Sequence, residues 1–175
     1  MQNEKENKME GVGDIFMRME YWSPNIKNRA AYHDYTVVDK IECGIVLEGR
    51  EVNSIRLGKC NLKGSWCSIE NGECFIKGMH ISAYQVRNGS GENLLQSQDN
   101  PYRVRKLLLH KNEIRKLENK CGQKGFTLIP LELYFSKGKV KILMGLCKGK
   151  KLYDKRETEK KREVDRELHR RMLKG

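Results

Sequence analysis

The stretch SWCSIENGECFIKGMHIS, residues 65–82, constrains the fold most, because a tight turn interrupts its apolar pattern. Asn71 and Gly72 form the residue pair that most readily takes the positive φ angles of a type I′ turn. Beyond the turn, apolar residues alternate with polar ones, as in a strand with one buried face: Phe75, Met79 and Ile81. The segment therefore predicts an antiparallel β-hairpin.

The rest of the chain up to residue 147 predicts more strands and two short helices. A second hairpin is expected where Ile129, Leu131, Leu133 and Phe135 alternate, residues 136–138 turn, and Val140, Ile142 and Met144 resume. Residues 33–49 predict one or two strands, and Val52, Ile55 and Arg56 predict a short helix that ends at Gly58. Residues 83–100 predict a loop. Leu107, Ile114, Leu117 and Cys121 predict a helix within residues 105–122, ending at Gly122.

These elements predict a mainly β fold with short helices. Four or more antiparallel strands in a chain of this size favour a small closed or partly open β-barrel of the oligonucleotide-binding kind. We expect three segments: a flexible leader over residues 1–25, a barrel domain over residues 26–147, and a basic tail over residues 148–175.

Charge indicates the kind of partner. The chain carries a net charge of +12, and its tail holds twelve Lys or Arg and six Asp or Glu with few large apolar side chains. Val164, Leu168 and Met172 form a stripe only one residue wide, so we expect the tail to be disordered when free and to become helical on a partner. A basic body and a basic tail predict a polyanionic partner, and nucleic acid is favoured over a membrane surface. No apolar run is long enough to span a membrane, and we expect a cytoplasmic protein.

The six cysteines do not predict a metal site. No two of them have the spacing of a zinc ribbon or a redox motif. A two-residue hairpin turn would pair Cys74 with Ile69 and Cys67 with Ile76, which keeps these two thiols apart. We expect buried free thiols, no metal and no cofactor.

The sequence also offers no strong catalytic motif. Residues 145–151 resemble a phosphate-binding loop only superficially, because the spacing is one residue short and Lys151 stands where Ser or Thr would bind magnesium. A fold that brought His33 and His80 together beside Asp34 would leave an RNA-processing enzyme open as an alternative. Basic clusters with interleaved tyrosines instead predict an RNA-binding or DNA-binding protein that is not an enzyme.

Four blocks in order, KNRAAYHDY, GIVLEGREVNSIRLGKCNL, RKLLLHKNEI and KGKKLYDKRE, closely resemble the small protein B (SmpB) family. This family comprises the tmRNA-binding proteins of bacterial trans-translation, which rescues stalled ribosomes and tags incomplete proteins. The resemblance covers the chain from about Asn28 to its C-terminus. It implies an oligonucleotide-binding-like barrel with a tail that is disordered in the free protein and helical on the ribosome.

The resemblance also implies roles for individual residues. The implied RNA-binding residues are Asn28, Arg29, His33, Glu42, Arg105, Lys106, Leu108, Lys139, Lys148 and Lys150. The implied ribosome-contacting residues of the tail are Gly149, Tyr153, Asp154, Lys155, Arg156, Leu168, Met172 and Leu173. In the family the tail serves accommodation and tagging rather than RNA affinity, and it senses an mRNA channel that holds no message.

The implied partners are the tRNA-like domain of tmRNA, the ribosome at its decoding centre and mRNA channel, and elongation factor Tu in the delivery complex. No membrane partner is implied. One alternative stays open among binding proteins, namely a general structured-RNA or ribosomal-RNA binding protein of the translation apparatus. Such a protein would bind many structured RNAs about equally.

Overall fold

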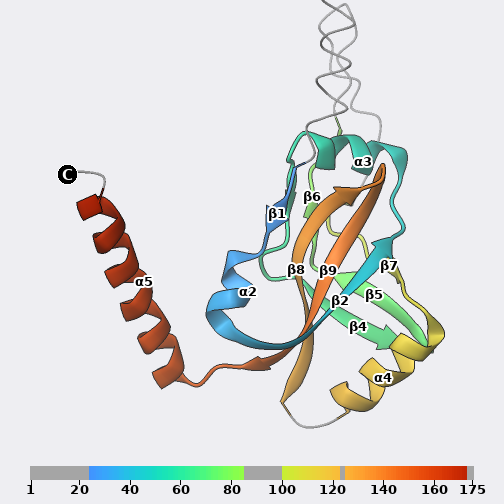
Figure 1. Cartoon of the computed structure of the whole chain (residues 1–175). Helices are drawn as coiled ribbons and strands as arrows, with labels where there is room; N and C mark the ends of the chain where they lie inside the picture. Colours follow the sequence, from blue (N-terminus) through green and yellow to red (C-terminus); the bar gives the residue numbers. More distant parts are fainter. Residues whose placement is uncertain (1–23, 85–99, 123–124, 173–175) are drawn as a thin grey trace, which may run out of the picture.

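The structure is a computed structural model that describes residues 24–84, 100–122 and 125–172. Its main body is a closed antiparallel β-barrel (Figure 1). Six strands form the wall: β2 (Tyr35–Ile45), β4 (Trp66–Glu70), β5 (Glu73–Lys77), β7 (Arg105–Leu108), β8 (Phe126–Ser136) and β9 (Lys139–Gly149). The order β8-β4-β5-β7-β2-β9 closes into a ring because β8 also pairs with β9. The predicted mainly β fold is confirmed.

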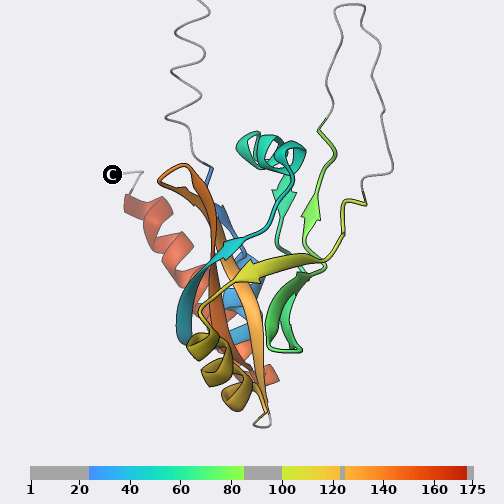
Figure 2. The same ribbon diagram turned by 90° about the vertical axis from the view of Figure 1, so that its right-hand side faces the viewer.

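Short elements extend this ring. Strand β1 (Ile26–Lys27) pairs with β8, and β3 (Cys60–Asn61) pairs with β6 (His80–Ile81) in a separate two-stranded sheet. The helices are α2 (Arg29–Asp34), α3 (Gly49–Arg56), α4 (Lys111–Cys121) and α5 (Leu152–Met172). Figure 2 shows α3 and α4 at opposite ends of the barrel.

The first predicted hairpin is confirmed in its turn and in its register, but Ile76 faces the core where Phe75 was expected to do so. Asn71 and Gly72 have φ angles of 52° and 73°, as a type I′ turn requires. Ile69 pairs with Cys74, and Cys67 lies opposite Ile76. All six cysteines are free thiols. Burial raises the pKa of these thiols, to about 12 for Cys43 and for Cys60, so they remain protonated and unreactive near neutral pH.

The second predicted hairpin joins β8 to β9 through Lys137 and Gly138, both at positive φ. A register shift between Pro130 and Glu132 breaks the expected alternation along β8. Leu133 faces the barrel core, whereas Ile129 and Leu131 pack in a second cluster with Ala31 of α2. Because of the bulge, β8 contributes side chains both to the barrel core and to the apolar cluster under α2.

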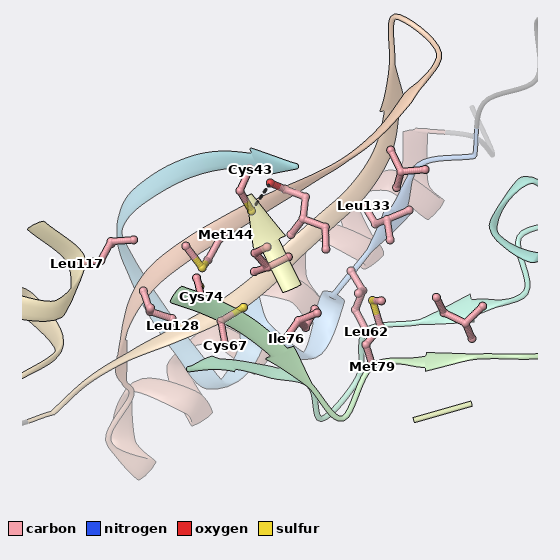
Figure 3. Packing of buried hydrophobic residues seen from close by; sticks show 14 of the residues in the cluster. Cys43, Leu62, Cys67, Cys74, Ile76, Met79, Leu117, Leu128, Leu133 and Met144 are labelled. Atoms are coloured by element: carbon pink, nitrogen blue, oxygen red, sulfur yellow. Dashed lines mark hydrogen bonds between the residues drawn. The ribbon is translucent and has the colours of Figure 1, made fainter. Parts of the chain in front are cut away.

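Figure 3 shows the barrel core, where side chains from β2, β4, β5, β8 and β9 meet. The thiol of Cys43 donates a hydrogen bond to the backbone oxygen of Ile142 at 3.4 Å. Ile76 and Leu133 are fully buried, and burial of each such side chain stabilises the fold by about 1.5 to 3 kcal/mol. The core fixes the strands on which the outward-facing polar residues lie.

Helix α3 confirms the predicted short helix. The prediction of one helix within residues 105–122 was wrong at its start, because residues 105–108 form strand β7. Arg105 and Leu107 are buried there and Leu108 is exposed, which is the alternation of a strand that pairs with β5 on one side and β2 on the other. Helix α4 begins only at Lys111, and Gly122 follows its last residue as predicted.

Helix α5 occupies most of the basic tail. Strand β9 ends at Gly149, two residues past the expected end of the barrel domain. The structure therefore contains the helical form of the tail, and disorder of the free tail stays a prediction. No helix within residues 24–84, 100–122 and 125–172 is both long and apolar enough to cross a membrane. Of the expected leader, residues 1–23 lie outside the described residues, as do residues 85–99 of the expected loop.

Candidate nucleic-acid interface

One row of residues crosses the outer wall of the barrel over four strands. Leu108 of β7 pairs with Gly44 of β2, Gly44 pairs with Lys141 of β9, and Lys141 pairs with Tyr134 of β8. Glu42 lies two residues from Gly44 on the same face of β2, because side chains alternate along a strand. We call Glu42, Leu108, Tyr134, Lys139 and Lys141 the outer row.

Glu42 is the electrostatic centre of the outer row. It is exposed, it accepts a hydrogen bond from the Tyr134 hydroxyl, and it forms an ion pair with Lys141 at 3.2 Å. The bond from Tyr134, and then that from Lys141, lowers the pKa of Glu42. The same contact raises the pKa of Tyr134 to about 12. Glu42 is therefore ionised at neutral pH and can accept hydrogen bonds from base or ribose donors.

Leu108 adds an apolar contact point to the outer row. It is 53% exposed and lies on the outer face of β7. A Cβ added at Gly44 would lie 3.3 Å from the Cβ of Leu108, so any larger residue at position 44 would crowd this leucine.

Lys139 is exposed at the start of β9. Lys106, also on β7, forms an ion pair with Glu73 and remains partly exposed. The outer row thus combines an apolar side chain, a carboxylate and cations.

A second group of predicted residues gathers where α2, the end of β9 and α5 meet. His33 bonds to Asp34 at 3.0 Å through Nδ1 and to Glu159 of α5 at 2.9 Å through Nε2. These two bonds, that to Asp34 first, raise the pKa of His33 above its ordinary value. Lys150 donates from Nζ to the backbone oxygen of Tyr32 at 3.2 Å. Arg29 and Lys148 are exposed nearby on α2 and β9.

Two residues that the resemblance implied as RNA contacts are buried. Asn28 is only 5% exposed, and its Nδ2 donates to the backbone oxygens of Leu62 and Pro130 at 3.0 and 2.9 Å. Its Oδ1 accepts the Ala31 amide at 3.2 Å and caps α2. In the structure Asn28 positions the helix that carries Arg29 and His33, and a direct RNA contact of Asn28 stays a prediction.

Arg105 is the second buried residue of this set. It is 1% exposed, and its guanidinium binds Glu51 at 2.7 Å. It also donates to the backbone oxygens of Met79, Arg103 and Pro101. Bonds from Arg103 and Arg105 lower the pKa of Glu51 against the opposing effect of burial. Arg105 therefore ties α3 to the segment that leads into β7, and a direct RNA contact of Arg105 stays a prediction.

The described tail residues are open to solvent. Tyr153 is 74% exposed, Leu168 48% and Met172 77%. Asp154 accepts the backbone amide of Lys151 at 3.2 Å, which caps the start of α5, and Arg156 is exposed. The side chain of Lys155 and all of Leu173 lie outside the described residues. The apolar stripe of the tail is thus available for a partner.

Sequence reasoning missed Tyr134 and Glu51. The alternation along β8 could have indicated that Tyr134 faces outward, but only the sheet order brings it to Glu42. Glu51 gave no signal, because its arginine partners are distant in sequence.

The enzyme alternative gains no support from the described contacts. His33 bonds to Asp34 and Glu159, whereas His80 packs against the ring of Tyr102 with centroids 5.0 Å apart. In the part of the chain that the structure describes, no three His, Cys, Asp or Glu residues form a group suited to a metal ion.

Comparison with known proteins identifies the family. The sequence model described as SmpB protein matches residues 25–174. The chain belongs to the SmpB family. A relative from Acetivibrio thermocellus, named SsrA-binding protein, is 55% identical over 146 residues, covering 83% of this chain and 90% of the relative. The SsrA-binding protein of Syntrophobacter fumaroxidans is 51% identical over 144 residues, covering 82% and 85%.

A solved SmpB structure gives the same family. It is described as "tmRNA-SmpB: a journey to the center of the bacterial ribosome" and aligns with a TM-score of 0.60 at 43% identity. The alignment covers 74% of this chain and 86% of that chain. The SmpB family identity and the barrel fold therefore rest on sequence and structure together.

Proposed function

We propose that this chain binds the tRNA-like domain of tmRNA, also called SsrA RNA, and delivers it to stalled ribosomes for trans-translation. The observation that carries the proposal is the outer row of an SmpB-family barrel, which presents Glu42 and Leu108 beside the exposed Lys139 and the half-buried Lys141. Cations bind phosphates and hold the register, while the carboxylate and the leucine contact the shape of an RNA loop. The relatives are named for RNA binding, so the protein acts as a binding factor and not as an enzyme.

We also propose a division of labour between barrel and tail. The barrel domain binds RNA through the outer row, Lys106, Arg29, His33, Lys148 and Lys150. The tail contacts ribosomal RNA in the mRNA channel through residues of the 149–156 block and through Leu168, Met172 and Leu173. Elongation factor Tu joins the delivery complex, and the site of action is the cytoplasm. The exposed stripe on α5 supports the role of the tail.

A binding titration at fixed salt tests the proposed function. The protein is titrated with the tRNA-like domain of tmRNA, an elongator tRNA and unrelated hairpins of equal length. A clear preference for the tRNA-like domain is expected. Equal affinity for all three RNAs would instead favour a general structured-RNA binding protein.

Substitution of Glu42 tests the outer row within the same titration. Glu42→Gln removes the charge that accepts from RNA donors and from Tyr134, so affinity for the tRNA-like domain should fall about tenfold, or about 1.4 kcal/mol. Glu118→Gln is the matched control, because Glu118 is an exposed carboxylate on α4. Equal affinity of both variants would remove Glu42 from the interface.

A further inference from the structure

A recess on the outer wall of the barrel lies apart from the outer row. It has a volume of about 360 Å³ and is bounded by α2 on one side and by the start of β4 on the other. Its lining includes Ala31, Tyr35, Ser65, Trp66, Thr127 and Ile129. It shares no residue with the outer row. A recess of this size is large enough for a small planar ligand.

Trp66 forms the most distinctive wall of the recess. It is 47% exposed, so nearly half of a large aromatic surface remains in contact with solvent. A Cβ added at Gly78 would lie 3.1 Å from Cζ3 of Trp66, and Gly78 has a φ of +72°. The indole therefore rests close against the backbone of a glycine that no other residue can replace without strain. Trp66 is held in place at the rim rather than buried in the core.

The floor of the recess is apolar and its edges carry hydroxyl groups. Ala31 and Ile129 are 3% and 5% exposed and belong to the cluster under α2. Ser65 is only 4% exposed, and its hydroxyl donates to the backbone oxygen of Leu62. The partly exposed Thr127 also lines the recess. An aromatic wall, an apolar floor and a few polar edges suit a flat heterocycle.

The charges around the recess favour a base over a phosphate inside it. Asp34 lines the recess, and its carboxylate, which also bonds to Nδ1 of His33, disfavours a phosphate there. Outside the lining, Arg29 and Lys63 are exposed next to the lining residues Asn28 and Gly64. They lie where the phosphates that flank an inserted base would need cations.

We propose that this recess binds one unpaired nucleobase of the RNA, stacked against Trp66. The proposal rests on the proposed function, because it gives the same RNA a second contact on a different part of the barrel wall. Unpaired bases commonly stack on aromatic side chains in RNA complexes, whereas paired bases inside a duplex are not accessible.

The fluorescence of Trp66 tests the proposal directly. The chain has two tryptophans, so Trp22→Phe leaves Trp66 as the only one. We expect the tRNA-like domain of tmRNA to quench this fluorescence over the same concentration range in which it binds. A fully paired RNA duplex of equal length should leave the fluorescence unchanged. Unchanged fluorescence at saturating tRNA-like domain would overturn the proposal.

Affinity gives a second readout. Trp66→Ala should weaken binding of the tRNA-like domain about tenfold, because the stacking of one base on an aromatic side chain raises affinity by about that factor. Leu57→Ala is the matched control, because Leu57 is also 47% exposed but lies at the end of α3. Equal affinities of the two variants would contradict stacking on Trp66 while leaving the proposed function intact. Failure of the unmodified protein to bind the tRNA-like domain would overturn both proposals.

Discussion

Arg105 shows how a single residue of a basic surface can serve the interior. Its charge is buried, and Glu51 together with three backbone oxygens compensates for the loss of water. Such a buried charge must keep its partners, because a buried charge without a partner lowers the stability of the fold. The function of Arg105 is therefore to hold the start of β7 in place, so that Lys106 and Leu108 face outward.

Substitution of Arg105 should lower stability rather than remove an RNA contact. Arg105→Ala leaves Glu51 with Arg103 as its remaining arginine partner and three backbone oxygens without their donor, so we expect a loss of stability of about 1 to 3 kcal/mol. Chemical denaturation followed by circular dichroism measures this loss. Lys139→Ala serves as the control, because Lys139 is exposed and should change stability little. A stable Arg105→Ala protein with weakened RNA binding would restore Arg105 to the interface.

Residue patterns in the sequence predict which residues pair beside a turn, but they do not predict which side chains contact each other between strands that are distant in sequence. Asn71 and Gly72 determine their turn, and the turn determines that Cys67 lies opposite Ile76. Nothing local indicates that Tyr134 bonds to Glu42, since the contact depends on which strands are neighbours. Asn28 and Arg105 look like surface residues in sequence, and only the packing around them shows that they are buried.

At the scale of elements, the contact between α2 and α5 joins the barrel to the tail. Glu159 of α5 bonds to His33 of α2, a residue that we expect to contact RNA. We therefore expect RNA that binds His33 to compete with Glu159 for the imidazole.

The contact between the two helices should depend on pH. The pKa of His33 is raised above 6.5 by its bonds to Asp34 and then Glu159. A raised folded-state pKa means that the contact contributes fully below pH 6.5 and is lost as the pH rises through the raised value. An NMR titration of the His33 ring measures this pKa. Glu159→Gln should lower it part of the way, since Asp34 remains.

Glu163→Gln provides the control for that titration, because Glu163 is an exposed carboxylate one turn further along α5. It should leave the pKa of His33 unchanged. If Glu159→Gln and Glu163→Gln behaved alike, α5 would not be docked on α2 in solution.

Element prediction from sequence failed where tertiary pairing overrode a local pattern. Residues 105–108 fit a helical spacing together with Ile114 and Leu117, yet they form β7 because β5 and β2 supply partners on both sides. The bulge in β8 also escaped prediction. It lets Ile129 and Leu131 pack under α2, whereas strict alternation would have kept them on the face of Leu133.

At the scale of the molecule, closure of the barrel creates the outer row. Leu108 and Tyr134 are far apart in sequence, and β2 and β9 between them complete the surface. The sequence predicted strands, hairpins and a basic surface, so the fold class followed. The ring order did not, because the pairings of β8 with β4 and of β7 with β2 join strands that are distant in sequence and leave no trace in local periodicity.

The central claim is that the barrel binds the RNA and the tail acts on the ribosome. Removal of residues 155–175 tests it most directly, with affinity for the tRNA-like domain and tagging on stalled ribosomes measured on the same truncated protein. The truncation also removes Glu159, which competes for His33, while the bond from His33 to Asp34 remains. We predict RNA affinity that is no weaker than that of the full chain, together with loss of tagging. A large loss of RNA affinity, or tagging that survives the truncation, would contradict the account.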